Sequence, residues 1–265
     1  MAEGVALFSG GLDSTLAILS ILKQGIRVHA LRFVTPFDCH VTSGKHALEV
    51  SAPDKGYGFT ITSLRIDEQF LDMVKSPRHG YGKNMNPCID CRILMLREAK
   101  KFMEAAGASF IVTGEVLGQR PMSQRKDILY HIEKEAGLKN LVVRPLSAKL
   151  LRITLPEAQG IVDRGMFHGF SGRSRKPQIA LAEEWGLKGY PSPAGGCLLT
   201  DPIYANRLRD LLANEEAPSL RHIELLKTGR HFRFSPSCKI IVGRDREENR
   251  KIEVLSSDAD FLLKV

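Results

Sequence analysis

Segments with the period of strands alternate with segments with the period of helices along the first part of the chain. Short apolar or alternating runs, typical of strands, occupy residues 4–8, 27–34 and 58–66. Apolar positions at helical spacing follow them, over residues 16–22, 43–56 and 68–75. Because right-handed crossovers join successive strands of this kind, the pattern predicts parallel strands with a ligand site beyond their carboxyl ends.

The most regular helical pattern runs from residue 88 to residue 106 and ends at Gly107. Its apolar stripe consists of Ile89, Ile93, Leu96, Ala99, Phe102, Met103 and Ala106. We expect Asn86 to cap this helix and Pro87 to be its first residue. Further strands are predicted at residues 109–113 and 141–146, and a further helix at 174–185.

The sequence pattern changes after Asp201. Two helical runs, residues 203–214 and 219–228, precede two short strand-like pieces, residues 231–235 and 239–243. We therefore predict an α/β domain over residues 1–201, with a Rossmann-like parallel sheet and helices on both faces. A small α+β region is predicted over residues 202–265.

The composition is typical of a globular protein with an anionic partner. Of the 265 residues, 43% are hydrophobic and 26% are charged, as in ordinary soluble proteins. The chain has no apolar run of membrane-spanning length and no secretory signal, so we expect a cytoplasmic protein without a membrane partner. The net charge of +8 favours a partner such as nucleic acid. Five cysteines, an odd number, favour thiols, metal ligands or redox groups over a disulfide framework.

A glycine turn joins the first predicted strand to the first predicted helix. In the sequence LFSGGLDST, residues 7–15, Gly10 and Gly11 let the backbone approach a phosphate closely. The helix that follows supplies free N–H groups and a positive dipole end. The spacing matches neither the lysine-containing P-loop nor the G-x-G-x-x-G dinucleotide motif. A tight strand-to-helix turn capped by Ser9 is the alternative.

The segment SGGLDS, residues 9–14, resembles the S-G-G-x-D-S signature of the PP-loop ATP pyrophosphatases. The residues that this resemblance assigns to the pyrophosphate part of ATP are Ser9, Gly10, Gly11 and Ser14. The resemblance also implies a role for Asp13, because a carboxylate beside a polyphosphate either orders the N–H groups of the loop or meets Mg2+. Adenine contacts are implied near the end of the second strand, around Phe33.

Cys88 and Cys91 lie three positions apart, on one face at the amino end of a predicted helix. That position favours thiolates, which nucleophilic and metal-binding cysteines both require. Cys197 follows much later, after two glycines. Three thiolates without an evident fourth ligand suit an iron-sulfur cluster with one open iron, or a thiol relay, better than a closed zinc site. For the Cys-x-x-Cys motif alone, structural zinc and inert buried thiols stay open. The other cysteines, predicted to be structural, are Cys39 and Cys238.

Residues 111–124 (IVTGEVLGQRPMSQ) and 142–146 (VVRPL) resemble tRNA 4-thiouridine synthetases, whereas the Asn-Pro before Cys88 and the Gly-Gly before Cys197 resemble tRNA 2-thiouridylases. Together these resemblances span about residues 4–200. They imply an ATP-dependent tRNA sulfurtransferase that adenylates a uridine carbonyl oxygen and replaces it with sulfur. Thiouridylases of the cluster-free type typically have aspartate at the position of Cys88, whereas cluster-dependent members have Cys-x-x-Cys and one distant cysteine. This chain fits the second pattern better.

The resemblance also implies residue roles. The implied catalytic residues are Asp13, Cys91 and Cys197, and the implied ligands of a [4Fe-4S] cluster are Cys88, Cys91 and Cys197. By their position just after the strand at residues 109–113, Glu115, Gln119 and Gln124 are candidates to order the nucleotide or the base. The Thr-Gly-Glu triplet matches the family, which favours Glu115, and Gly114 and Gln119 are expected to join it at the nucleotide. The sulfur would be a sulfide on the open iron or a persulfide on Cys197.

Basic and aromatic residues are interleaved over residues 164–176, which suits RNA. They are Arg164, Arg173, Arg175 and Lys176 with Phe167, His168 and Phe170, and Arg120 and Arg125 extend the predicted patch. A solvated loop with two core phenylalanines is the alternative. Residues 225–249 resemble the opening of the RNA-binding modules of ribosome-associated quality-control factors. The expected partners are tRNA, a sulfide or persulfide donor, and a second copy of the chain in a homodimer.

Two other functions stay open at this point. A PP-loop enzyme of this kind could thiolate or amidate a small molecule, and an amidating enzyme would not need Cys91 or Cys197. A non-catalytic RNA-binding adaptor with a vestigial nucleotide site would not need Asp13, although the intact SGGLDS segment argues against it.

Overall fold

The computed structural model describes residues 2–38, 58–190 and 197–263. By its contacts the chain divides into two units. The first consists of Met1–Val34, Thr42–Ile66 and Pro87–Gly195, and the second of Thr35–Val41, Asp67–Asn86 and Gly196–Val265. The helix expected at residues 43–56 and Cys39 both lie outside the described residues. The division into domains at residue 202 stays a prediction.

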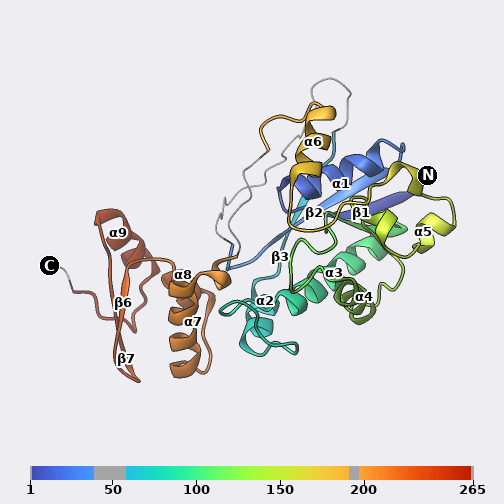
Figure 1. Cartoon of the computed structure of the whole chain (residues 1–265). Coiled ribbons are helices and arrows are strands. Elements are labelled where there is room, and N and C mark those ends of the chain that lie inside the picture. Colours follow the sequence, from blue (N-terminus) through green and yellow to red (C-terminus); the bar gives the residue numbers. More distant parts are fainter. Residues whose placement is uncertain (1, 39–57, 191–196, 264–265) are drawn as a thin grey trace. The chain divides into compact units, whose positions relative to one another are not determined.

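The first unit is built on a five-stranded sheet with the order β3-β2-β1-β4-β5. Figure 1 labels three of these strands, β1, β2 and β3. Its strands are β1 Glu3–Leu7, β2 Arg27–Val34, β3 Ile61–Arg65, β4 Phe110–Thr113 and β5 Val142–Val143. Every neighbouring pair is parallel, as the sequence pattern predicted. Because β2 lies on one side of β1 and β4 on the other, the strand order reverses direction at β1. Such a switch point leaves a crevice at the carboxyl ends of β1 and β4, where open sheets of this kind bind their ligands.

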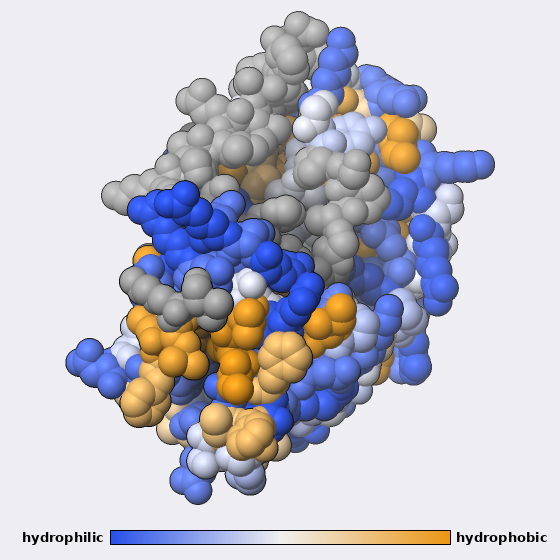
Figure 2. Space-filling view, turned by 90° about the vertical axis from the view of Figure 1, so that its left-hand side faces the viewer, coloured by the Kyte–Doolittle hydropathy of each residue, from blue (hydrophilic) through white to orange (hydrophobic). Residues whose placement is uncertain are grey.

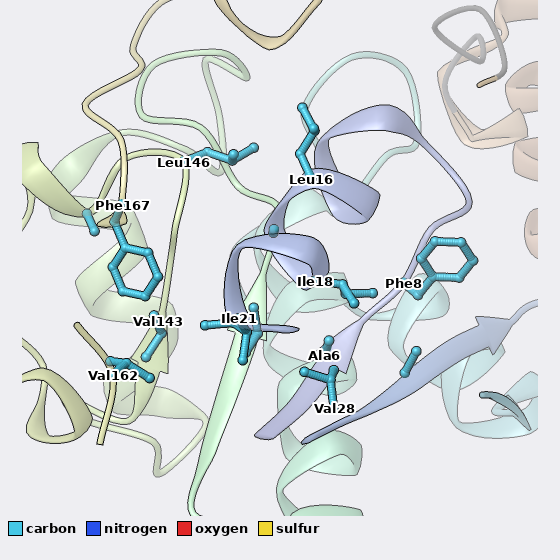
Figure 3. Close-up of a cluster of buried hydrophobic side chains, with 14 of the residues drawn as sticks. Ala6, Phe8, Leu16, Ile18, Ile21, Val28, Val143, Leu146, Val162 and Phe167 are labelled. Atoms are coloured by element: carbon cyan, nitrogen blue, oxygen red, sulfur yellow. The ribbon is translucent and has the colours of Figure 1, made fainter. Parts of the chain in front are cut away.

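Helices cover both faces of this sheet. One face carries α1 (Leu12–Leu22) and α6 (Lys176–Glu184), and the other carries α3 (Cys88–Ala105) and α4 (Lys126–Glu135). Successive residues of β1 point to opposite faces, so Val5 and Leu7 join the buried cluster of α3 whereas Ala6 joins that of α1. Figure 3 shows Ala6 with Ile18 and Val28 in the buried cluster that contains α1. A strand that is buried on both faces has to be apolar throughout, which explains the run at residues 4–8. The predicted fold class is confirmed.

Helix α3 keeps the predicted apolar stripe but begins differently from the prediction. The stripe residues that are buried are Ile93, Leu96, Ala99 and Met103. Pro87 occupies the N-cap position, and no side chain among the described residues caps the helix, so the predicted Asn86 cap is wrong. The backbone of Asn86 belongs to the preceding turn, because its N–H donates to the carbonyl of Lys83 and its carbonyl accepts from Gly82. The first turn of α3 therefore starts without a side-chain cap.

Some helices were not expected from the sequence. They are α4, the single turn α5 (Leu155–Ala158) and α9 (Arg246–Leu255). Helix α4 buries Leu129 and Ile132 next to an equally buried Glu133, and α9 buries Glu248. Both segments are amphipathic at helical spacing, so the sequence contained a helical signal that the prediction missed. The other short helical turns of the first unit are η1 Ala148–Leu150 and η2 Arg164–Met166.

The second unit combines helices with a β-hairpin. Its elements are α2 Asp67–Lys75, η3 Leu198–Thr200, α7 Pro202–Asn214, α8 Leu220–Leu225, the antiparallel strands β6 Arg230–Ser235 and β7 Cys238–Val242, and α9. Phe37 packs against Phe70 and Tyr204, with ring centroids 5.7 and 6.2 Å away. This aromatic contact joins the segment after β2 to α2 and α7. Among the helices that the structure describes, none combines the length and the apolar composition needed to cross a membrane.

Candidate functional site

The glycine turn follows β1 and leads into α1 at the switch point of the sheet. Gly10 has a φ of +78°, in the left-handed region that favours glycine. Gly11 is the N-cap residue, and no side chain in the described segments caps α1, so the alternative of a Ser9 cap is wrong. The Ser14 hydroxyl instead donates to the carbonyl of Gly11 (2.8 Å) and accepts from the N–H of Ser9 (3.3 Å). The turn is thus closed on itself, while the amino end of α1 keeps N–H groups for an anion.

Gly114, directly after β4, lets two backbones meet beside this turn. A Cβ atom at Gly114 would lie 2.5 Å from the backbone nitrogen of Ser14 and 2.6 Å from the carbonyl oxygen of Asp13. Both atoms belong to the backbone at the start of α1 and cannot rotate away. Glycine is therefore required where the end of β4 forms a wall against the start of α1.

Asp13 is held by side chains from distant parts of the chain. The amide nitrogen of Gln119 donates to Oδ2 of Asp13 at 2.7 Å. The amide nitrogen of Gln178, in α6, donates in turn to Oε1 of Gln119 at 2.9 Å. Arg175, just before α6, lies with its Nη2 atom 3.9 Å from Oδ1 of Asp13. The acidic residue of the turn thus belongs to a polar cluster of Asp13, Gln119, Arg175 and Gln178, named here the Asp13 cluster.

Glu115 is buried in an ion network at the end of β4. Its Oε2 atom accepts from Nε of Arg144 (3.0 Å) and from the hydroxyl of Thr113 (3.1 Å), and Oε1 lies 3.7 Å from Nε of Arg92. Burial by itself raises the pKa of Glu115, but Arg144 and then Arg92 outweigh it, so this pKa lies below its ordinary value. Arg144 also pairs with the buried Glu133. The ionised Glu115 therefore ties the end of β4 to the residue after β5 and to α3.

Other predicted contact residues have structural partners. The side-chain oxygen of Gln124 accepts from the N–H of Arg120 (2.9 Å), which shapes the loop after β4. Phe33 packs partly buried against the cluster of α3, and its predicted contact with adenine stays a prediction.

Cys88 and Cys91 occupy the first turn of α3, and both are partly exposed. Arg120 lies within electrostatic range of both thiols and of Arg92. The sulfur of Cys91 is 4.0 Å from that of Met95. Two thiols one turn apart with a cation nearby form an environment that stabilises thiolates.

Cys197 is the N-cap residue of η3 in the second unit, and its sulfur lies 3.8 Å from the carbonyl oxygen of Phe37. Two bonds of this unit connect the chain beyond Cys197 with the loop that leads into α3. The N–H of Met85 donates to the carbonyl of Leu199 at 3.1 Å, and the amide of Asn84 donates to that of Thr200 at 2.7 Å. Within the described ranges, no group of three or more His, Cys, Asp or Glu side chains is arranged to hold a metal ion.

The residues of the basic segment 164–176 differ in burial and in their partners. Arg164 pairs with Glu157 at 2.7 Å, and Phe167 is buried, so both have structural roles. Arg173 and Lys176 are exposed.

Sequence reasoning missed Arg92, Arg144 and Gln178. Only Gln178 has a signal, because it is a polar residue on the helix stripe that carries the buried Leu181 and Ala182.

Comparison with known proteins identifies two segments. A family described as thiamine biosynthesis protein (ThiI) matches residues 1–149, and one described as NFACT protein RNA binding domain matches residues 229–265. A probable tRNA sulfurtransferase of Thermococcus kodakarensis is 27% identical over 148 residues, covering 54% of this chain and 36% of the relative. One of Methanosarcina mazei is 29% identical over 125 residues, covering 43% and 28%. The chain thus spans about a third of the length of these relatives, or less.

Solved structures are also similar to the chain. A complex of a 4-thiouridine synthetase with RNA and bound ATP aligns with a TM-score of 0.46 and 21% identity, covering 84% of this chain and 52% of that one. The U34-tRNA thiolase NcsA from Methanococcus maripaludis with its [4Fe-4S] cluster aligns with a TM-score of 0.40 and 15% identity, covering 85% and 73%. Because the first family matches more than half of the chain and its SGGLDS turn lies at the switch point of a parallel sheet, the chain belongs to the thiamine biosynthesis protein (ThiI) family.

Proposed function

We propose that the chain is an ATP-dependent tRNA sulfurtransferase that adenylates a uridine carbonyl oxygen and replaces it with sulfur. One observation carries the proposal: the glycine turn, with an acidic Asp13 held by Gln119, lies at the carboxyl ends of β1 and β4. The family match and the names of the relatives support the same function.

In the proposed reaction the uridine carbonyl oxygen attacks the α-phosphorus of ATP, and the bond to pyrophosphate breaks. A hydrosulfide then adds to the ring carbon, the carbon-oxygen bond breaks, and the original oxygen leaves on AMP. The residues proposed to hold the pyrophosphate part are Ser9, Gly10, Gly11 and Ser14, with Asp13 orienting the turn or meeting Mg2+. N–H groups arranged in advance stabilise the charge that develops on the departing pyrophosphate.

The cysteines are proposed to hold the sulfur that is transferred to the base. Cys88 and Cys91 are soft donors on one helical turn, and Cys197 is a third partly exposed thiol. By residue type, three thiols are the donors of a [4Fe-4S] cluster with one open iron, and Cys88, Cys91 and Cys197 are the residues proposed to hold it. When bound, such a cluster would supply an iron with an open coordination position for the delivery of sulfide.

A persulfide on Cys197 is the alternative sulfur source. Its outer sulfur would add to the activated ring carbon with loss of AMP. Cys91 would then attack the sulfur of Cys197, which releases the thiolated base and leaves a Cys91–Cys197 disulfide. An external thiol would have to reduce this disulfide before the next turnover.

Pyrophosphate release tests the function. Wild-type protein should release pyrophosphate from ATP faster when unmodified tRNA is added, and Asp13→Ala should abolish the stimulation while the exposed carboxylate variant Asp72→Ala retains it. Release that needs a small acceptor instead of tRNA would favour the small-molecule enzyme. If cells that carry only the Asp13→Ala protein show no loss-of-function phenotype, the RNA-binding adaptor would be favoured.

Anaerobic purification tests the sulfur chemistry. The cluster hypothesis expects a coloured protein containing iron and sulfide, loss of both in Cys88→Ala, and retention of both in Cys238→Ala, whose thiol is exposed on the hairpin. A colourless, iron-free wild-type preparation would remove the cluster and leave the persulfide route.

The hairpin of the second unit is proposed to contact tRNA, in line with the RNA-binding family that matches residues 229–265. On one face of the paired strands, large apolar side chains are exposed: Phe232, Phe234, Ile240 and Val242. Figure 2 shows apolar residues gathered on the face that this region presents. Exposed aromatic rings are platforms on which unpaired bases stack.

A further inference from the structure

The hydrogen bonds of the Asp13 cluster run in a fixed direction. An ionised carboxylate only accepts, so the amide nitrogen of Gln119 has to face Asp13. The oxygen of Gln119 is then left to accept from the amide nitrogen of Gln178. This order turns Oε1 of Gln178 away from Gln119 and makes it an acceptor for another group.

Three polar atoms of the cluster are buried without a hydrogen-bond partner among the described residues. They are Oδ1 of Asp13, Nε of Arg175 and Oε1 of Gln178. Gln178 is fully buried, with 0% of its surface exposed. Buried polar atoms are nearly always paired, because leaving one unpaired is costly. Three in one cluster, beside the uncapped amino end of α1, indicate the place of a polar ligand.

The unpaired atoms define the chemistry of that ligand. Two acceptor oxygens, one of them on a carboxylate, suit the water shell of a divalent cation, which Mg2+ keeps when it binds through a carboxylate and phosphates. The guanidinium nitrogen of Arg175 suits a phosphate oxygen. A magnesium-bound diphosphate presents both kinds of group at once.

We infer that Arg175 and Gln178 line the nucleotide site together with the glycine turn and the end of β4, and that they bind the magnesium-bound pyrophosphate part of ATP. Arg175 binds a phosphate oxygen, and Gln178 accepts from a water of the cation. The inference rests on the proposed function. It differs from the sequence prediction for Arg175, which placed this residue on an RNA-binding surface together with Arg173.

Calorimetric binding of inorganic pyrophosphate with Mg2+ tests the inference, with tRNA binding as a second readout. Arg175→Gln and Gln178→Leu should each weaken pyrophosphate binding about tenfold or more, the usual effect of losing a hydrogen bond near a charge. Arg173→Gln removes an exposed arginine two residues away and should leave pyrophosphate binding unchanged. Arg175→Gln should not weaken tRNA binding. If the Arg175→Gln protein unfolds at the same temperature as wild type, its weaker pyrophosphate binding is a local effect and does not come from unfolding.

The outcomes separate this inference from the proposed function. If wild-type protein binds pyrophosphate and both variants bind it equally well, the unpaired atoms hold water only and the inference is wrong, while the function stands. If Arg175→Gln weakens tRNA binding and spares pyrophosphate, the residue belongs to the RNA surface and the inference is again wrong. If wild-type protein binds neither pyrophosphate nor ATP, the nucleotide site and the inference both fail.

Discussion

The side-chain amide of Gln119 donates a 2.7 Å hydrogen bond to the carboxylate of Asp13, although the two residues are 106 positions apart. Asp13 is the second residue of α1, the helix after β1, and Gln119 lies in the loop after β4. The bond is possible because β1 and β4 are parallel neighbours in the sheet, so that the segments after their carboxyl ends start at the same edge. It gives Asp13 a fixed orientation before any ligand arrives.

Gln119→Leu should weaken binding of magnesium ATP about tenfold or more. The substitution removes a hydrogen bond to a charged group, typically about 1.5–3 kcal/mol, and frees Asp13 to rotate. Calorimetry of nucleotide binding measures the effect. The exposed Gln159→Leu is the matched control, and equal affinities of the two variants would show that the bond does not organise the site.

Gly114→Ala should disturb the glycine turn. The added Cβ meets the backbone of Ser14 and Asp13, so we expect a loss of about 1–3 kcal/mol in unfolding free energy together with weaker ATP binding. Gly58→Ala is the control, because a Cβ at Gly58 meets no atom within 4 Å. Chemical denaturation of both variants checks the prediction, which fails if they are equally stable.

Glu115→Gln should lower the free energy of unfolding and make it change less as the pH falls into the acidic range. The pKa of Glu115 is below its ordinary value of 4.5 in the folded chain, so its stabilising effect is present above that pH and is lost as the pH falls through the folded pKa. Leaving Arg144 buried without this partner should cost about 3–5 kcal/mol near neutral pH. Urea unfolding over a range of pH measures both effects, with the exposed Glu104→Gln expected to behave like wild type.

The hairpin should lose stability in mild acid because of His231. Burial lowers the pKa of His231 to about 4 from an ordinary value of 6.5, despite the hydrogen bond between Nε2 and the carbonyl of Thr228. Between these two values the unfolded chain binds more protons than the folded one, so stability falls as the pH drops from 6.5 to about 4. Nuclear magnetic resonance titration of the imidazole measures its pKa. A value near 6.5 would contradict the prediction.

Phe234→Ala should weaken tRNA binding without changing stability. Its ring is 83% exposed on β6, and stacking of one base on an aromatic ring is worth about 1–3 kcal/mol. We therefore expect affinity to fall about fivefold to a hundredfold in a filter-binding assay at fixed salt. Val254→Ala removes a similarly exposed apolar side chain, 78% exposed on α9, and should leave the affinity unchanged.

Local sequence patterns were sufficient for most of the regular elements. The apolar run at residues 4–8 became β1, and the stripe from Ile93 to Met103 became the buried face of α3, because alternation and helical spacing act over a few residues. The same local logic put the SGGLDS turn between a strand and a helix. Helix α4 was missed although its segment is amphipathic at helical spacing, because its apolar face is short and its fully buried apolar residues are only Leu129 and Ile132.

Only the tertiary structure decided how the site is assembled. Nothing near Gly114 in the sequence shows that its missing side chain makes room for the backbone of Ser14, and nothing near Arg175 shows that it lies beside Asp13. The Asn86 cap failed because the backbone of Asn86 is bound in the preceding turn. Periodicity records which face of an element is buried, whereas contacts between residues far apart depend on strand order and crossover path, and these arise only when the whole sheet has formed.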